Sequence, residues 1–229
     1  MTEELKLLER AALDFAAKEL VDGRVERDSY PFAPLFSAIL EKTHELGFTG
    51  IMLPEEMGGS AQGITGLATV LGDISRTDAS LAGVIFTTVL AQEVMRNAKA
   101  KELLAGLIGD ATDFTGSLLA FPSYIAPGQV KNPIRARAVD GHYALSGKLG
   151  YLVLGNVARH ALVPAAVEGR GGLSFFLVDL SAAGVSLSEP VVSLGLRACP
   201  AVDVTFSDTL STLVGEAGGG EDYLARASD

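Results

Sequence analysis

The sequence predicts an α+β protein in which an N-terminal α-helical bundle is followed by an antiparallel β-barrel. Three observations predict this order. Apolar residues recur at helical spacing from residue 2 to about residue 110. Alternating strand-like runs flank Asp140-Gly141, a strong hairpin signal because both central residues of a type I′ turn need positive φ. Short strands separated by turns then continue to Phe206, which is typical of a barrel or a sandwich.

Composition and charge exclude several classes of protein. Of the 229 residues, 48% are hydrophobic and 20% are charged, as in globular proteins. The net charge of −10 argues against nucleic acid and anionic membranes, which both favour basic patches. A single cysteine, Cys199, rules out an internal disulfide framework and fits a reducing compartment. With no secretory signal and no long apolar stretch, we expect a cytoplasmic protein.

Helices are expected throughout the first part of the chain. Thr2 can cap a first helix whose opening turn carries Glu3 and Glu4, and Asp22-Gly23 ends that helix. Further helices are expected over about 35–46, 64–74, 79–97 and 101–108, with Thr77-Asp78 as a cap and Pro54–Gly59 as a loop. The helix over 79–97 is apolar on most sides, so we expect it to be buried.

The β region is expected to contain short strands joined by turns. The expected ranges are 113–120, 134–139, 142–146, 149–154, 159–167, 173–180 and 202–207. Gly218–Gly220 reads as a flexible joint, and residues 221–229 read as the first turns of a helix. The expected domains are therefore a helical domain over 1–111, a middle β-barrel over 112–215, and a linker with a truncated helix over 216–229.

Several kinds of active site lack support in the sequence. His44, His142 and His160 are scattered with no His or Cys at ligand spacing, so no metal site is expected. No glycine fingerprint lies between a strand and a helix, and the match to a nucleophile elbow around Ser60 fails. Cys199, which precedes Pro200, is interpreted as a small buried hydrophobe.

Four segments, taken in order, resemble those of one enzyme family. They are Leu46–Gly59, which contains Pro-Glu-Glu-Met-Gly-Gly, then Asp73–Ala82, Asp140–Gly147 and Leu194–Phe206. Together they resemble the acyl-CoA dehydrogenases over about residues 1–222. The resemblance implies an N-terminal helical domain, a middle β-barrel and a C-terminal helical domain. It also implies an FAD-dependent oxidoreductase of fatty acid metabolism that forms an oligomer and acts on an acyl thioester of CoA or a carrier protein.

The resemblance also assigns residues to the site. In the family a hydride passes to FAD while a carboxylate removes an α proton from the substrate. That carboxylate lies in the C-terminal domain, and this sequence ends as that domain would begin, so no catalytic residue is assigned. The implied cofactor contacts are Leu119, Ala120, Tyr151 and Val153, and the implied substrate contact is Ala126.

Some of these positions depart from the family pattern. Ala120 and Val153 stand where the family has hydroxyls, and Ala126 stands in place of a serine, whereas Tyr151 keeps the aromatic ring that shields the flavin. Each lost group costs about 0.5–1.5 kcal/mol of binding, so we expect FAD binding to be weakened or to need a partner chain. Backbone amides at Leu119, Ala120 and Val153 could still reach the ring, although Leu119 and Val153 also suit a barrel core.

Three functional hypotheses follow from the sequence. The chain is a dehydrogenase subunit whose partner supplies the C-terminal domain, a catalytically silent relative that binds a thioester or a protein, or a piece of an ordinary dehydrogenase. Without a C-terminal helical domain, the helical domain and the barrel would each expose apolar surface. We therefore expect self-association or a partner chain.

Overall fold

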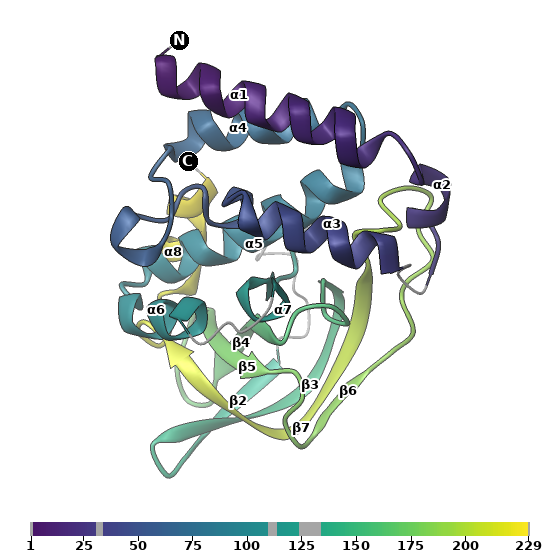
Figure 1. Cartoon of the computed structure of the whole chain (residues 1–229). Coiled ribbons are helices and arrows are strands. Elements are labelled where there is room, and N and C mark those ends of the chain that lie inside the picture. The colour runs from purple at the N-terminus through teal and green to yellow at the C-terminus, as the bar shows by residue number, and fades with distance from the viewer. Residues whose placement is uncertain (1, 31–33, 110–113, 124–133, 229) are drawn as a thin grey trace. The chain divides into compact units, whose positions relative to one another are not determined.

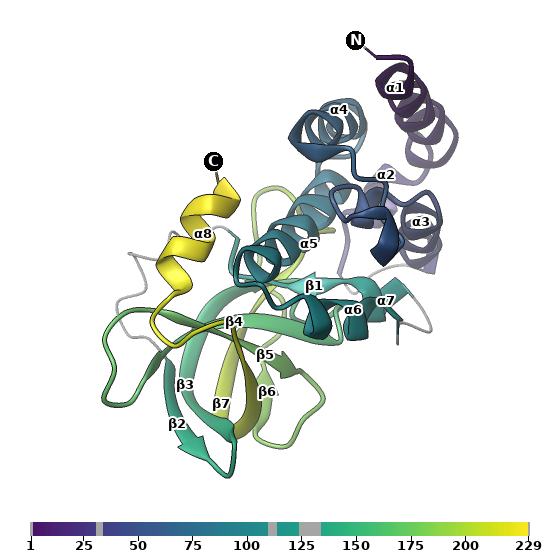
Figure 2. The same ribbon diagram turned by 90° about the vertical axis from the view of Figure 1, so that its left-hand side faces the viewer.

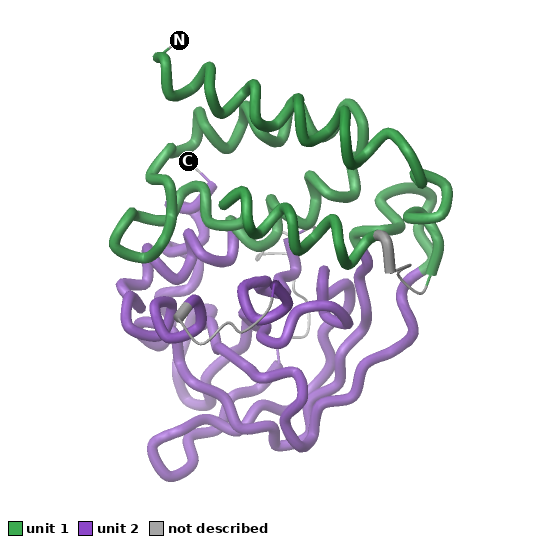
Figure 3. The backbone as a smooth tube through the Cα atoms, in the orientation of Figure 1, with its two compact units in different colours: residues 1–89, 192–199 green, residues 90–191, 200–229 purple. Residues whose placement is uncertain are grey.

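A computed structural model describes residues 2–30, 34–109, 114–123 and 134–228 (Figure 1). The chain divides into two compact units, of which the first comprises residues 1–89 and 192–199 and the second comprises residues 90–191 and 200–229 (Figure 3). The division falls inside one helix, α5 (Ala79–Asn97). The expected domain boundary at 111/112 lies within residues 110–113, outside the described residues, and stays a prediction.

The first unit is helical. It contains α1 (Glu3–Phe15), the π-helical turn η1 (Ala16–Leu20), α2 (Arg24–Arg27), α3 (Pro34–Glu45), the 3-10 turns η2 (Phe48–Gly50) and η3 (Glu55–Met57), α4 (Gly63–Ser75) and the first part of α5. Two expected caps are confirmed. The Thr2 hydroxyl accepts the Leu5 N–H at 3.2 Å, and Asp78 Oδ1 accepts the Leu81 N–H at 3.1 Å.

Aromatic and aliphatic side chains fill the core of the first unit. The rings of Phe15 and Phe48 meet edge to face with centroids 5.8 Å apart. Most apolar residues of α5 are buried as expected, whereas Leu90 is half-buried and Phe86 is 39% exposed. The one fully buried arginine of this core, among the described residues, is Arg27.

Arg27 ties together three points of the first unit. Its Nε donates to Asp78 Oδ2 at 3.0 Å, and its two terminal nitrogens donate to the carbonyl oxygens of Leu20 and Asp22. Asp78 is the cap of α5, and Leu20 ends η1. A buried charge is tolerated when it is paired and its donors are used, so this side chain joins the end of η1 to the start of α5.

The second unit combines strands with short helices. Besides the end of α5 it contains α6 (Lys101–Gly109), α7 (Phe114–Ser117), β1 (Leu119–Ala120), β2 (Ile134–Val139), β3 (His142–Val153), β4 (His160–Val167), β5 (Ser174–Asp179), β6 (Val185–Leu187), β7 (Ala201–Val214) and α8 (Gly220–Ser228) (Figure 2). Its core includes the ring pairs Phe121–Phe175 and Tyr143–Phe176, with centroids 5.8 and 5.1 Å apart.

Five strands of this unit close on themselves, which confirms the predicted β-barrel. The pairings run β4–β2–β3–β7–β5 and return to β4, while β1 also pairs with β4 and β6 with β7. All of these pairs are antiparallel except β1–β4 and β2–β4. The two parallel pairs were not predicted, because parallel neighbours are not joined by a tight turn that could be recognised in the sequence.

The predicted hairpin is confirmed, whereas the predicted strand over 113–120 is largely wrong. Asp140 and Gly141 have φ of 45° and 82°, and Val139 pairs with His142 across the turn. In contrast, Phe114–Ser117 is a helical turn in which the Ser117 hydroxyl donates to the Phe114 carbonyl at 2.8 Å. Local hydrogen bonds of this kind compete with strand pairing, so only Leu119–Ala120 remains a strand.

Other strand boundaries differ from the expectation. The ranges 142–146 and 149–154 form one continuous strand, β3, and the last strand, β7, runs on to Val214. The short strand β6 was not expected.

The expected joint before the last helix is held against the barrel. The Gly218 N–H donates to the Ser174 hydroxyl and the Gly220 N–H to the Leu173 carbonyl, both at 2.8 Å. The expected helix then follows as α8. None of the described helices is long and apolar enough to cross a membrane.

Candidate functional site

The structure brings together the two segments that carry the expected flavin contacts. Leu119 and Ala120 form β1, and Tyr151 and Val153 lie at the end of β3. Phe121, directly after β1, exchanges two backbone hydrogen bonds with Val153, of 3.1 and 3.2 Å. The expected substrate contact, Ala126, lies outside the described residues.

Burial separates these residues into two groups. Leu119, Ala120 and Val153 are at most 2% exposed, whereas Tyr151 is 49% exposed. The N–H of Val153 is already donated to Phe121, and the N–H of Leu154 is donated to the Pro200 carbonyl at 2.8 Å. The accessible part of this site is therefore the Tyr151 ring.

A β-bulge presents the Tyr151 ring. Leu149 pairs with Val204 and Leu152 pairs with Val202, so Gly150 and Tyr151 together oppose the single residue Asp203. Tyr151 has a φ of 56°, in the left-handed region, and its N–H donates to Asp203 Oδ1 at 3.2 Å. The sequence analysis missed Asp203, although a glycine inside a strand pattern is a recognised sign of a bulge.

A hollow of about 320 Å³ lies beside this bulge. It is lined by Lys148, Leu149, Gly150, Ser186, Leu187, Ser188, Asp203 and Thr205. One ammonium, one carboxylate and three hydroxyls face it, so it offers both donors and acceptors to a polar group.

A second hollow, of about 310 Å³, lies where α6 and α7 meet the barrel, and it contains His160 and Arg159. Nδ1 of His160 is buried with no hydrogen-bond partner among the described residues. Burial lowers the pKa of His160, and Arg159 adds to this, against the opposing effect of Asp179. Burial alone would raise the pKa of Asp179, but hydrogen bonds from Ser181 bring the net shift below the ordinary value. A carboxylate that removes a proton near neutral pH is usually tuned in the other direction, so Asp179 does not fit the role of a base.

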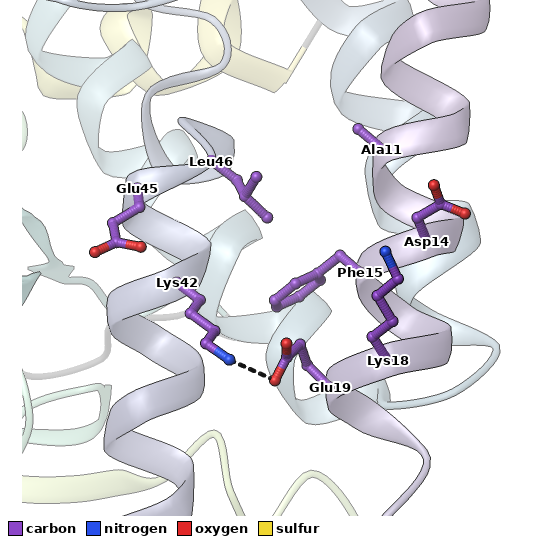
Figure 4. A pocket seen from close by; sticks show the side chains of 8 residues that line it. All are labelled: Ala11, Asp14, Phe15, Lys18, Glu19, Lys42, Glu45 and Leu46. Atoms are coloured by element: carbon purple, nitrogen blue, oxygen red, sulfur yellow. Dashed lines mark hydrogen bonds and ion pairs between the residues drawn. The ribbon is translucent and has the colours of Figure 1, made fainter.

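The first unit has a hollow of its own, of about 410 Å³, between α1, η1 and α3. Figure 4 shows the Phe15 ring and the Leu46 side chain in it, and the ion pair between Lys42 and Glu19, whose Nζ and Oε2 atoms are 2.7 Å apart. Asp14, Lys18 and Glu45 complete a rim of mixed charge. The hollow suits a small apolar group, and it contains none of the expected flavin or substrate residues.

The residues of the second unit fit a flavin in part. A flat ring system can stack on an accessible aromatic face, and Tyr151 provides one. The side-chain hydroxyls are missing at Ala120 and Val153, and both side chains are buried. No cluster of three or more His, Cys, Asp or Glu residues that could hold a metal ion occurs within the described part of the chain.

Comparison with known proteins shows which proteins this chain is similar to. The profile described as "Acyl-CoA dehydrogenase, N-terminal domain" matches residues 2–102. Over these residues the chain is similar to the N-terminal domain of acyl-CoA dehydrogenases. The match begins at the cap of α1 and ends at the start of α6, so it includes the Pro54–Gly59 loop on which the resemblance was first noted.

Matches to individual proteins extend the similarity into the barrel. The chain is 28% identical over 220 residues to a 3-(aryl)acrylate reductase of Clostridium sporogenes, with 89% of this chain and 55% of the relative covered. It is 26% identical over 236 residues to a cyclohex-1-ene-1-carbonyl-CoA dehydrogenase of Syntrophus aciditrophicus, with 99% and 56% covered. The chain therefore spans about half the length of these relatives.

The fold matches solved structures as well. A structure of acyl-CoA dehydrogenase complexed with FAD from Bacillus anthracis superimposes with a TM-score of 0.82 at 23% identity, covering 99% of this chain and 40% of that one. At this identity the similarity concerns the fold. It confirms the predicted combination of a helical region and a β-barrel.

Proposed function

We propose that the chain is the FAD-binding part of an acyl-CoA dehydrogenase. With further helices supplied by a partner chain or by more of the same chain, it would carry out α,β-dehydrogenation of an acyl thioester. FAD, when bound, accepts the hydride that leaves the substrate. The observation that carries this proposal is the pairing of Phe121 with Val153, because it joins the two segments expected to contact the flavin.

In this proposal the residues of this chain bind and orient the cofactor but do not remove the proton. Tyr151 would cover one face of the ring, and the buried residues Leu119 and Ala120 of β1 are proposed to lie near its rim. The buried side chain of Val153 would support the site by packing the barrel from within. Ala126, whose surroundings the structure does not describe, is proposed as the substrate contact on the resemblance alone.

The base is proposed to lie outside this sequence. The two hollows of the second unit contain the carboxylates of Asp203 and Glu102. Asp203 already accepts the Tyr151 N–H, and Glu102 lies in a different hollow from the Tyr151 bulge. The expected domain division over 1–111, 112–215 and 216–229 belongs to the same proposal, since the third part would lead into the region that supplies the base.

A partner chain is supported by apolar surface on the first unit. Leu194 is fully exposed and Val192 is 85% exposed, on a segment between β6 and β7. Large apolar side chains grouped on a surface mark sites of association. We propose that this segment is covered in a homo- or hetero-oligomer.

The alternative is a silent relative that binds a thioester or a protein without turnover. It is favoured by the loss of hydroxyls at Ala120 and Val153.

The proposal is compatible with either direction of the reaction, oxidation or reduction of the acyl group. One relative is named a dehydrogenase and another a reductase, so either direction suits the proposal.

The two candidates differ in their response to FAD. Purified chain is titrated with FAD, alone and co-expressed with the C-terminal region of a longer family member, while flavin fluorescence and visible absorbance are recorded. We expect flavin to bind in at least the co-expressed form and an acyl-CoA to bleach its absorbance.

Tyr151→Ala should weaken FAD binding by about 5- to 100-fold, as the loss of a stacked aromatic worth ~1–3 kcal/mol implies. Leu210→Ala, an exposed apolar residue on β7, is the control. A chain that stays colourless in both forms contradicts the flavoprotein proposal, and a chain that binds flavin but never bleaches supports the silent relative.

A further inference from the structure

The β3–β7 ladder contains two β-bulges with the same local geometry. In the first, Gly150 and Tyr151 of β3 oppose Asp203 of β7. In the second, Ser207 and Asp208 of β7 oppose Ser146 of β3. In each bulge the second residue has positive φ, 56° at Tyr151 and 50° at Asp208, and a side chain on the facing strand bonds its N–H.

Positive φ is unfavourable for a tyrosine. An L-residue in the left-handed region brings its Cβ close to the following carbonyl oxygen, which costs roughly 1–2 kcal/mol, and bulky residues rarely occupy it. Something around Tyr151 must therefore stabilise the conformation. Its backbone N–H donates to the Asp203 carboxylate, whose Oδ1 lies 3.2 Å from the Tyr151 nitrogen. Gly150 makes room for this contact, since a Cβ there would lie 3.3 Å from the same carboxylate oxygen.

Asp203 is itself held in place from the other side. Its N–H donates to the Ser188 hydroxyl at 2.9 Å, and its carbonyl accepts the Ser188 N–H, also at 2.9 Å. The backbone of Asp203 is thus bound to the segment after β6, while its side chain reaches across to β3. These two bonds fix the backbone from which the carboxylate extends toward the Tyr151 N–H.

We propose that Asp203 is a positioning residue that holds the Tyr151 backbone in the left-handed conformation, so that the Tyr151 ring covers the flavin. This inference rests on the proposed function. In this arrangement Asp203 contacts neither the cofactor nor the substrate, and it acts through Tyr151 alone. Without the carboxylate, the bulge relaxes toward ordinary extended backbone, and the side chains of a strand then alternate to the opposite face.

The test compares variants of the 229-residue chain, in the form that binds FAD. Asp203→Ala removes the acceptor, whereas Asp203→Asn keeps an oxygen in the same place. The matched control is Asp208→Ala, because Asp208 is also an exposed aspartate of β7 and accepts a hydrogen bond at the other bulge. Two quantities are measured: hydrogen exchange of the Tyr151 amide by NMR, and the dissociation constant of FAD with the visible spectrum of the bound flavin.

We expect Asp203→Ala to speed exchange of the Tyr151 amide and to weaken FAD binding about 3- to 10-fold, as the loss of one hydrogen bond implies. The bound flavin should also lose the spectral features that stacking on Tyr151 produces. Asp203→Asn should restore most of both effects, and Asp208→Ala should change neither.

Unchanged exchange in Asp203→Ala overturns the inference. So does equal FAD binding by wild type and Asp203→Ala, since the ring would then be placed without the carboxylate. Equal losses in Asp203→Ala and Asp208→Ala also overturn it, because they indicate general weakening of the barrel. A wild-type chain that binds no FAD in any form is a different result, which removes the proposed function and the inference that rests on it.

Discussion

Removing the charge of Arg27 should be among the most destabilising single changes in the first unit. Its side chain is 1% exposed and the Asp78 side chain 9% exposed, so Arg27→Met would leave a buried carboxylate without its cation. It would also leave the carbonyl oxygens of Leu20 and Asp22 without this donor. Breaking a buried pair by removing one partner costs about 3–5 kcal/mol. For a chain of this size, such a loss lowers the melting temperature by roughly 6–20 °C.

Urea denaturation followed by far-ultraviolet circular dichroism measures this effect. The matched control is Arg226→Gln in α8, which breaks an exposed pair with Asp222 whose side chains are 61% and 59% exposed. An exposed i,i+4 pair contributes about 0.3–0.5 kcal/mol, so the control should be nearly neutral. Adding Asp78→Asn to Arg27→Met removes the stranded charge while keeping the amide oxygen as a helix cap, and it should recover part of the loss.

Two results would refute this reasoning. One is an Arg27→Met protein that loses less than about 1 kcal/mol, the range typical of exposed pairs. The other is a double variant that is as unstable as the sum of the two single variants, since the charges would then not be coupled.

Three further predictions concern other parts of the chain. Because burial lowers the pKa of His160, the unfolded chain binds protons more readily than the folded one. Unfolding free energy should therefore fall as the pH drops below about 6.5, and His160→Gln should flatten this decline. Gly59→Ala should destabilise the first unit, because a Cβ there would lie 2.1 Å from the Leu53 carbonyl oxygen. Leu194→Ser should reduce self-association in light scattering without lowering the melting temperature, since Leu194 is fully exposed.

Each of these three has a control and a result that would contradict it. Equal pH profiles for wild type and His160→Gln in urea titrations would show that other groups cause the decline. For Gly59 the control is Gly72→Ala in α4, where a Cβ meets no atom within 4 Å, and which should stabilise by about 1 kcal/mol. A wild-type chain that is monomeric in light scattering would contradict the Leu194 prediction, which assumes self-association.

Features that depend on neighbours in the sequence were predicted well. The cap at Thr2, the cap at Asp78 and the turn at Asp140-Gly141 each need only a few adjacent residues of the right kind. Helical spacing likewise gave the bounds of α5. Caps, turns and helix bounds depend on local propensity, which can be read from adjacent residues.

Features that depend on distant residues were not predictable in the same way. The parallel pairing of β2 with β4 joins segments with no turn between them. The contact of Asp203 with Tyr151 crosses 52 positions of sequence and depends on the register of β3 against β7. The strand predicted over 113–120 was wrong for a different reason. A hydrogen bond from the Ser117 hydroxyl favours a helical turn at Phe114–Ser117 over the strand that the apolar neighbours suggested. The expected cofactor residues Leu119, Ala120, Tyr151 and Val153 remain predictions whose contacts are untested.

The order in which the barrel strands leave the ribosome has a consequence for the nascent chain. β7 pairs with both β3 and β5, so the ring cannot shut until Val214 has been synthesised. Until then β3 and β5 each present unpaired backbone groups along one side, and such edges recruit strands from other molecules. The interval between translation of Asp179 and translation of Val214 is therefore the period in which this protein is most prone to co-translational misassembly.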